Sequence, residues 1–451
     1  MSGDLLDLAQ RIVAQARRSD ELEAYVTHER EFSVKAFAGE VEHVSSAEPR
    51  GAGVRVVSDG RAGFAYTTDV TDAGIADVVS KARDNSRFAT HDEAVGLAPP
   101  WTTDPPDVDG MVDESQTSVA PDDKVQFALD LEQATRTFDK RVRQVEEAAY
   151  SDSLTEVAFA TSSGISGSYR RTDAWCYAIA IATDRDDTQV GFEFDVGRGI
   201  SSLDFEDVAR RAAERALGIL GASKIASARM PVVFEPYTAA QFLGVLGSAL
   251  TGEAVAKGRS LFAGKLGQEV AANGLTLVDD GRIEGAPGSA PWDAEGVPTG
   301  RTAVIEAGVL SSYLYDVTSA RRDGTKSTGN AARSGFKSPP GPQPSNLAFE
   351  TTGDARSEVL SSAGRALLVQ DFHGVHSGAN AVSGDFSVGA TGRLLDGGEL
   401  GAPVKEVTIA APMLEILSGI VAVADDLRWI PFGGSYGGAT TLVSEMTVAG
   451  R

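Results

Sequence analysis

Two histidines spaced three residues apart, His373 and His376, have residue types and a spacing that could bind a metal ion. On a helix this spacing could present two imidazoles to one metal, with Asp371 or Asp385 nearby. The surrounding segment, ALLVQDFHGVHSGANAVSGDFSVG, instead predicts a strand and a glycine-rich turn. Residues three apart on a strand face opposite sides of the pleat. We therefore interpret both histidines as hydrogen-bonded residues of a turn near a sheet.

Two other segments match catalytic or nucleotide-binding motifs only in part. The segment GGSYG at 433–437 fits G-x-S-x-G, but a nucleophile elbow needs a following helix and a later histidine. A strand-like run follows Ser435, and the last histidine is His376. In GKL at 264–266, Leu266 replaces the Ser or Thr that would hold magnesium in a phosphate-binding loop. We assign neither a nucleophile nor a nucleotide site.

Two acidic clusters predict turns. The segment DRDD at 184–187 lacks the spacing of an EF-hand loop and lies between two strand patterns, so we expect a hairpin tip. Asp425 and Asp426 follow the apolar run MLEILSGIVAVA, and a turn explains them as well as a carboxylate pair would. Local motifs alone therefore identify no catalytic site.

The overall charge restricts the possible partners. The 451 residues include 41 Lys and Arg against 64 Asp and Glu, a formal net charge of -23, which repels nucleic acids and anionic membranes. The single cysteine, Cys176, lies in an apolar strand-like run and is interpreted as a core residue, so no disulfide framework exists. No apolar run is long enough to span a bilayer. We expect a cytoplasmic protein that binds neither nucleic acid nor membrane.

The first half of the chain predicts an α/β domain over residues 1–222. Alternating apolar and polar residues from 23 to 69 and from 141 to 200 predict an antiparallel sheet. Helical spacing predicts the helices that flank this sheet, at 4–18, 71–86, 121–138 and 204–219.

The second half, residues 223–451, predicts a mostly β domain with a central core helix, so the fold class is α+β. The helix covers the segment QFLGVLGSALTG (241–252), with Thr238 as its expected N-cap and apolar residues on a broad stripe. Glu-Ala-Gly at 306–308 predicts a hairpin. The proline-rich segment KSPPGPQPS (337–345) cannot be a central strand and predicts a loop.

The order of the C-terminal segments resembles the TldD/PmbA family, once called modulators of DNA gyrase. The segments that carry the resemblance are SLFAGKLGQEV, LTLVDDGRIEGAPGSAPWDAEGVPTGRTAVIEAGVLSSYLYD, TKSTGNAARS and SGDFSVGATGRLLDGGELGAPVKEVTIA. The resemblance covers most of the chain and is most specific from 231 to 451. It implies a pair of proteins, of which the TldD-like member is a zinc peptidase with a His-Glu-x-x-x-His helix. The other member, TldE or PmbA, lacks this motif and pairs with the first.

Counting back from SLFAGKLG, the family's first histidine, its glutamate and its second histidine fall on Leu243, Gly244 and Ser248, in that order. Leucine and glycine side chains offer no lone pair, and serine is a poor zinc ligand. The chain therefore resembles the metal-free TldE/PmbA subunit. The resemblance implies that it has no catalytic or metal-binding residue of its own. It also implies a TldD-like paralogue as partner, zinc in that partner, and peptides or unfolded protein segments as substrates.

Two other functions remain open at this point. The chain could be a stand-alone hydrolase whose centre uses His373, His376 and Asp371 or Asp385. It could also be a peptide-binding homodimer with no proteolytic role. No residue is assigned to a peptide groove, and nothing in the sequence supports a link to gyrase.

Overall fold

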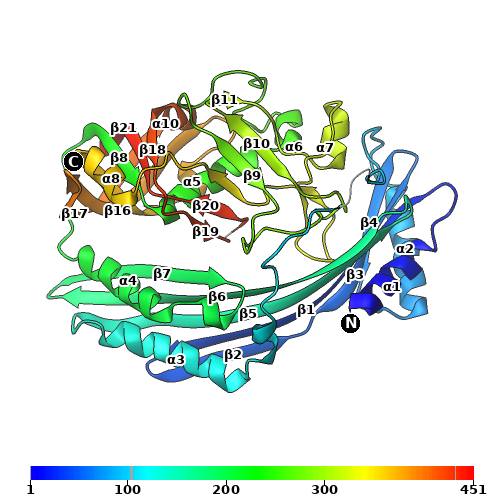
Figure 1. Ribbon diagram of the computed structural model, residues 1–451, viewed down its shortest axis with the longest axis horizontal. Coiled ribbons are helices and arrows are strands. Elements are labelled where there is room, and N and C mark those ends of the chain that lie inside the picture. Colours follow the sequence, from blue (N-terminus) through cyan, green and yellow to red (C-terminus); the bar gives the residue numbers. More distant parts are fainter. Residues whose placement is uncertain (1, 102–104, 432, 451) are drawn as a thin grey trace.

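A large antiparallel sheet forms the N-terminal part of the computed structural model, which describes residues 2–101, 105–431 and 433–450 (Figure 1). Its strands are β1 (Glu21–Phe37), β2 (Glu40–Ala47), β3 (Arg50–Ser58), β4 (Arg61–Thr67), β5 (Val142–Thr161), β6 (Ser166–Asp184) and β7 (Asp187–Gly197). The strand order is β4-β3-β1-β5-β6-β7, and β2 pairs with the second half of β1. The predicted antiparallel sheet is confirmed, and its two sequence segments form one continuous layer.

Four helices cover one face of this sheet (Figure 1). They are α1 (Ser2–Val13), α2 (Asp72–Ser86), α3 (Pro121–Thr137) and α4 (Phe205–Gly218), and two short 3-10 helices lie at Glu114–Ser118 and Ile200–Ser202. The helices α1 and α2 pack on apolar residues of β1 and β3, whereas α3 and α4 pack on β5 and β6. Since strand residues alternate between faces, this packing places Tyr25, Val157 and Phe159 on the opposite face.

Three of the four predicted helices are confirmed to within one residue at each end. The helix expected at 4–18 ends at Val13 instead, because the next amides tighten into i→i+3 bonds, from Gln15 N to the carbonyl of Ile12 and from Ala16 N to that of Val13. Among the described residues, no helix has both the length and the apolar character needed to cross a bilayer.

The C-terminal part contains two larger sheets and lies over the opposite face of the N-terminal sheet (Figure 1). In the first, the order β17-β16-β15-β8-β21-β18 is joined by pairing of β17 with β21, which closes five of these strands into a ring. The second has the order β11-β10-β9-β14-β20-β19, and β12 and β13 form a small ribbon. The α+β class with a mostly β C-terminal domain is confirmed.

The elements of this part have the following bounds. The strands are β8 (Ala228–Phe234), β9 (Leu277–Asp280), β10 (Arg301–Glu306), β11 (Val309–Leu310), β12 (Ala331–Ala332), β13 (Gly341–Pro342), β14 (Leu347–Phe349), β15 (Arg365–His373), β16 (Asp385–Asp396), β17 (Glu399–Pro412), β18 (Ile420–Val423), β19 (Arg428–Ile430), β20 (Tyr436–Gly438) and β21 (Thr441–Ala449). The helices are α5 (Pro236–Ala249), α6 (Gly252–Ala256), α7 (Val317–Arg322), α8 (Arg356–Ser362), α9 (Val375–Gly378) and α10 (Met413–Gly419).

The predicted turns lie where expected. Ala307 (φ 49°) and Gly308 (φ 94°) connect β10 to β11, and these positive φ angles are those of a tight hairpin turn. Asp184 pairs with Asp187 across the tip of the β6–β7 hairpin, with Arg185 at φ 55°. The proline-rich segment 337–345 contributes only β13 to the two-residue ribbon, as its proline content requires.

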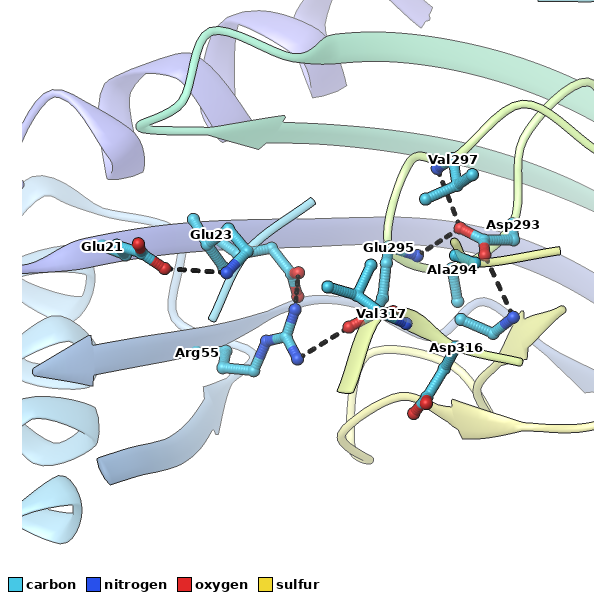
Figure 2. A network of polar contacts seen from close by, with 12 residues as sticks. Glu21, Glu23, Arg55, Asp293, Ala294, Glu295, Val297, Asp316 and Val317 are labelled. Carbon is cyan, nitrogen blue, oxygen red and sulfur yellow. Dashed lines mark hydrogen bonds and ion pairs between the residues drawn. The ribbon is translucent and has the colours of Figure 1, made fainter. Parts of the chain in front are cut away.

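A buried ionic network joins the two parts of the chain (Figure 2). Arg55 on β3 lies between Glu23 on β1, at 2.6 Å, and Glu295 of the C-terminal part, at 2.9 Å. Glu23 also pairs with Arg333, and Glu295 accepts a 2.8 Å hydrogen bond from Val317 N at the start of α7. All these side chains are at least nine-tenths buried. The network therefore fixes the C-terminal domain to the sheet through paired charges.

We expect Arg55→Ala to lower the free energy of unfolding by about 3–5 kcal/mol, because it leaves the buried carboxyl group of Glu295 without its ionic partner. The control Arg229→Ala removes an arginine that is 64% exposed and pairs with Glu445. That change is expected to cost at most about 1 kcal/mol. Denaturant unfolding of both variants checks the prediction, and equal losses would contradict it.

Candidate functional site

The helix that resembles the family's metal-binding helix is α5, which starts directly after the buried strand β8. Pro236 occupies its first turn, where the missing amide hydrogen costs no hydrogen bond. The expected N-cap at Thr238 is wrong. Glu235 is the N-cap residue, and Thr238 lies inside the helix, donating its hydroxyl to the carbonyls of Glu235 (3.0 Å) and Val369 (3.2 Å). The helix also ends at Ala249, earlier than expected.

The three residues predicted to occupy the family's metal and base positions do not form a donor set for zinc. Leu243 is 1% exposed and belongs to the main apolar core. A side chain built at Gly244 would meet the ring of Tyr436, since its Cβ would lie 3.5 Å from Cε2. Ser248 is exposed and donates its hydroxyl to the carbonyl of Val245 at 2.8 Å. These residues supply packing where a zinc site needs lone pairs, so we derive no step through a metal in this chain.

A mostly apolar cavity of about 420 Å³ lies against α5. Tyr237, Gln241, Gly244 and Val245 contribute its helical wall. The remaining wall is lined by Phe372, Gly374, Val375, His376, Ile430, Gly433 and Tyr436. The cavity is therefore bounded by α5 and by the segment that follows β15, of which His376 is a lining residue.

The structure does not bring the four residues of the alternative metal site together. His373, at the end of β15, shares a 2.8 Å hydrogen bond with Thr391 and lies 3.8 Å from Asp371. His376 lies on the one-turn helix α9, so part of the expected glycine-rich turn is helical. Asp385 accepts a 2.6 Å hydrogen bond from Ser383. Within the described ranges, no group of three or more His, Cys, Asp or Glu side chains is placed to hold a metal.

The other motifs occupy ordinary structural positions. Ser435 is buried and donates its hydroxyl to Asn346 at 2.7 Å, and strand β20 follows it, as expected. Cys176 is buried on β6, and burial raises the pKa of its thiol. Asp426 accepts hydrogen bonds from the amide (2.8 Å) and hydroxyl (2.7 Å) of Thr440. Ser435 is therefore bonded to an amide oxygen and Cys176 lies in an apolar core.

Sequence reasoning missed the buried acids near the interface between the two parts. Burial and the neighbouring Glu295 raise the pKa of Asp293, although three backbone amides donate to its carboxyl group. Burial also raises the pKa of Asp279 to about 7, against hydrogen bonds from Asn330 (2.6 Å) and Ser345 (2.7 Å). Asp293 lies in a loop and Asp279 on β9, and no local pattern indicates that the fold buries these carboxyl groups.

Three family models match most of the chain. They are described as PmbA/TldA metallopeptidase domain 1 (residues 22–86), central domain (114–220) and C-terminal domain (227–450). Metalloprotease PmbA of Escherichia coli O157:H7 is 30% identical over 96% of this chain and 93% of that protein. The fold and these matches define a protein of a metallopeptidase family. The chain belongs to the PmbA/TldD family.

Two crystal structures share the fold. A Thermotoga maritima protein whose name associates it with modulation of a DNA gyrase superimposes with a TM-score of 0.89. It is 24% identical, and the match covers 98% of this chain and 99% of that one. TldE from Thermococcus kodakarensis superimposes with a TM-score of 0.87 at 22% identity, covering 99% of both chains. The arrangement of the two parts of the chain is thus a property of the family fold.

We expect Leu243→Ala to destabilise the protein by about 2–5 kcal/mol, because it opens a cavity in the core around α5. Ser248→Ala, five residues along the same helix, removes only a local hydrogen bond on an exposed side chain and should change stability by less than about 0.5 kcal/mol. Thermal or denaturant unfolding gives both values. A small effect at position 243 would mean that this position is not a packing site.

Proposed function

We propose that this chain is the non-catalytic subunit of a heterodimeric TldD/TldE-type zinc metallopeptidase of the cytoplasm, which processes peptides or unfolded protein segments. The single observation that carries the proposal is α5, where Leu243, Gly244 and Ser248 occupy the family's metal and base positions without donor groups suited to zinc. The partner is a TldD-like paralogue that holds the zinc.

A subunit without a metal can still contribute to proteolysis by shaping the space in which a peptide binds. Extended peptides are held by main-chain hydrogen bonds to strand edges, and pockets select their side chains. Strand β2 suits such a contact, because it pairs with β1 alone among the described strands and is exposed along its whole length. Membership in a metallopeptidase family and the retained helix without its chemistry are both consistent with this role.

Co-expression with a paralogue that carries an intact His-Glu-x-x-x-His motif tests the proposal. We expect the two chains to elute as one complex whose peptidase activity on an unfolded protein or peptide is lost on chelation. The matched control is the same complex with the paralogue's motif glutamate changed to glutamine, which should assemble and stay inactive. Failure to form a complex, together with no gain in peptidase activity, would reject the proposal.

The alternative of a stand-alone hydrolase is favoured by one observation, which is that His376 lines the same cavity as Gly244. Metal analysis of the protein purified alone separates the two functions. The proposed function predicts well under one equivalent of zinc and no change on His376→Ala, because His376 belongs to no group of three or more potential metal ligands among the described residues. About one equivalent of zinc that disappears in His376→Ala would establish the alternative. A stable homodimer that never binds the paralogue would instead support a peptide-binding protein without a proteolytic role.

A further inference from the structure

A second cavity, of about 780 Å³, lies between the N-terminal sheet and the C-terminal part and takes no part in the site at α5. Its floor comes from β1, β5, β6 and β7, on the sheet face opposite the four helices. Its other walls come from residues 285–288 and 343–345, from Arg428 and Trp429 on β19, and from Pro431, Gly434 and Ser435. The volume is within the range of small-molecule and peptide sites.

Four arginines line this cavity: Arg171, Arg198, Arg333 and Arg428. Arg171 and Arg198 share one carboxylate, that of Asp173, at 3.0 and 2.6 Å. Two guanidinium groups therefore have a single negative charge between them. Guanidinium groups carry five donors in a planar fork that matches a carboxylate, so this pair has capacity for a further anion.

Two of these arginines also have buried donors without a partner. The side chain of Arg333 is 0% exposed; it binds Glu23 through Nη2 and the carbonyl of Ala294 through Nε at 3.1 Å. Its Nη1 has no hydrogen-bond partner among the residues that the structure describes, and neither does Nε of Arg198, whose side chain is 10% exposed. Buried charged donors are usually satisfied in native proteins, so these two have capacity for a further acceptor. Unpartnered Nε atoms also occur outside this cavity, at Arg50, Arg55, Arg170 and Arg211.

The rest of the wall indicates what carries that acceptor. Trp175, Trp429 and three prolines provide apolar surface beside the arginines. The carboxylates of Glu29, Asp173 and Asp195 lie in the same wall. They oppose a multiply charged ligand such as a nucleotide, but they can accept hydrogen bonds from peptide N–H groups. A peptide with one carboxylate next to an apolar side chain matches this cavity. Its carboxylate suits the arginines, its side chain suits the apolar surface, and its N–H groups suit the carboxylates of the wall.

We propose that this cavity binds a carboxylate of a peptide, with the neighbouring apolar side chain placed against Trp175 and Trp429. The carboxylate is held by the guanidinium groups of Arg171, Arg198 and Arg333. The biological meaning of this site rests on the proposed function, for which it supplies the ligand class. The binding itself is a property of this chain alone.

The test uses the full-length chain and fluorescein-labelled pentapeptides that end in Phe-Leu, measured by fluorescence anisotropy. The free-acid peptide should bind at least about tenfold more tightly than its C-terminal amide. A third peptide, amidated but with one aspartate side chain, identifies the source of the carboxylate. Binding of the third peptide as tight as that of the free acid also supports the proposal and assigns the carboxylate to a side chain.

Arg171→Gln and Arg198→Lys should each weaken binding of the preferred carboxylate peptide by about tenfold or more, since the first loses the charge and the second loses the fork. The control Arg229→Gln lies outside this cavity and should bind like the unmodified protein. Melting curves show whether each variant is folded. Of the two changes, Arg171→Gln should disturb folding less, because the side chain of Arg171 is 36% exposed.

Three results would overturn the inference. They are equal binding of the free-acid and neutral amide peptides, unchanged binding in both folded arginine variants, and displacement of the peptide by ATP or inorganic phosphate at lower concentration than by unlabelled peptide. Complex formation with the paralogue is scored separately. An active complex in which this chain shows no preference for a carboxylate would reject the cavity and leave the proposed function standing.

Discussion

The interaction on which the arrangement of this protein depends is the burial of Arg55 between Glu23 and Glu295. Burial opposes ionisation of Glu23, but the charges of Arg333 and Arg55 lower its pKa overall. A buried ion that keeps its charge must have its partners in place. The network therefore ties the C-terminal domain to the sheet, and the cavity lies between the two.

The two faces of the N-terminal sheet differ in what they pack against. Apolar residues of one face pack under the helices α1 to α4, whereas the other face carries Tyr25 and Phe159 beside the charged residues that meet the C-terminal domain. Strands β1, β5 and β6 run continuously beneath both areas. One sheet thus serves as a core for its helices and as a platform for a polar interface, because its side chains alternate between the faces.

Helix α5 carries the three residues that we propose replace the family's metal-binding group. Leu243 is part of the core that the two C-terminal sheets share, and Gly247 allows the ring of Tyr436 to approach the helix. A Cβ at position 247 would lie only 3.0 Å from that ring. The helix is therefore held by packing, which needs no metal. The polar surface available for recognition lies elsewhere, in the arginines between the two parts of the chain.

The sequence by itself determined the elements whose cause is local. Alternation predicted the strands of the first sheet, helical spacing predicted α2, α3 and α4, and Glu-Ala-Gly predicted the β10–β11 hairpin, because periodicity and turn geometry act between near neighbours. The emptied slots at Leu243, Gly244 and Ser248 were also readable, but only through a family resemblance. Local signals failed at Thr238, where a proline and an incoming strand set the start of the helix. Only the tertiary structure decided which charges meet: Arg333 and Glu23 are 310 residues apart, and no local pattern encodes a contact that exists only after both parts of the chain have folded together.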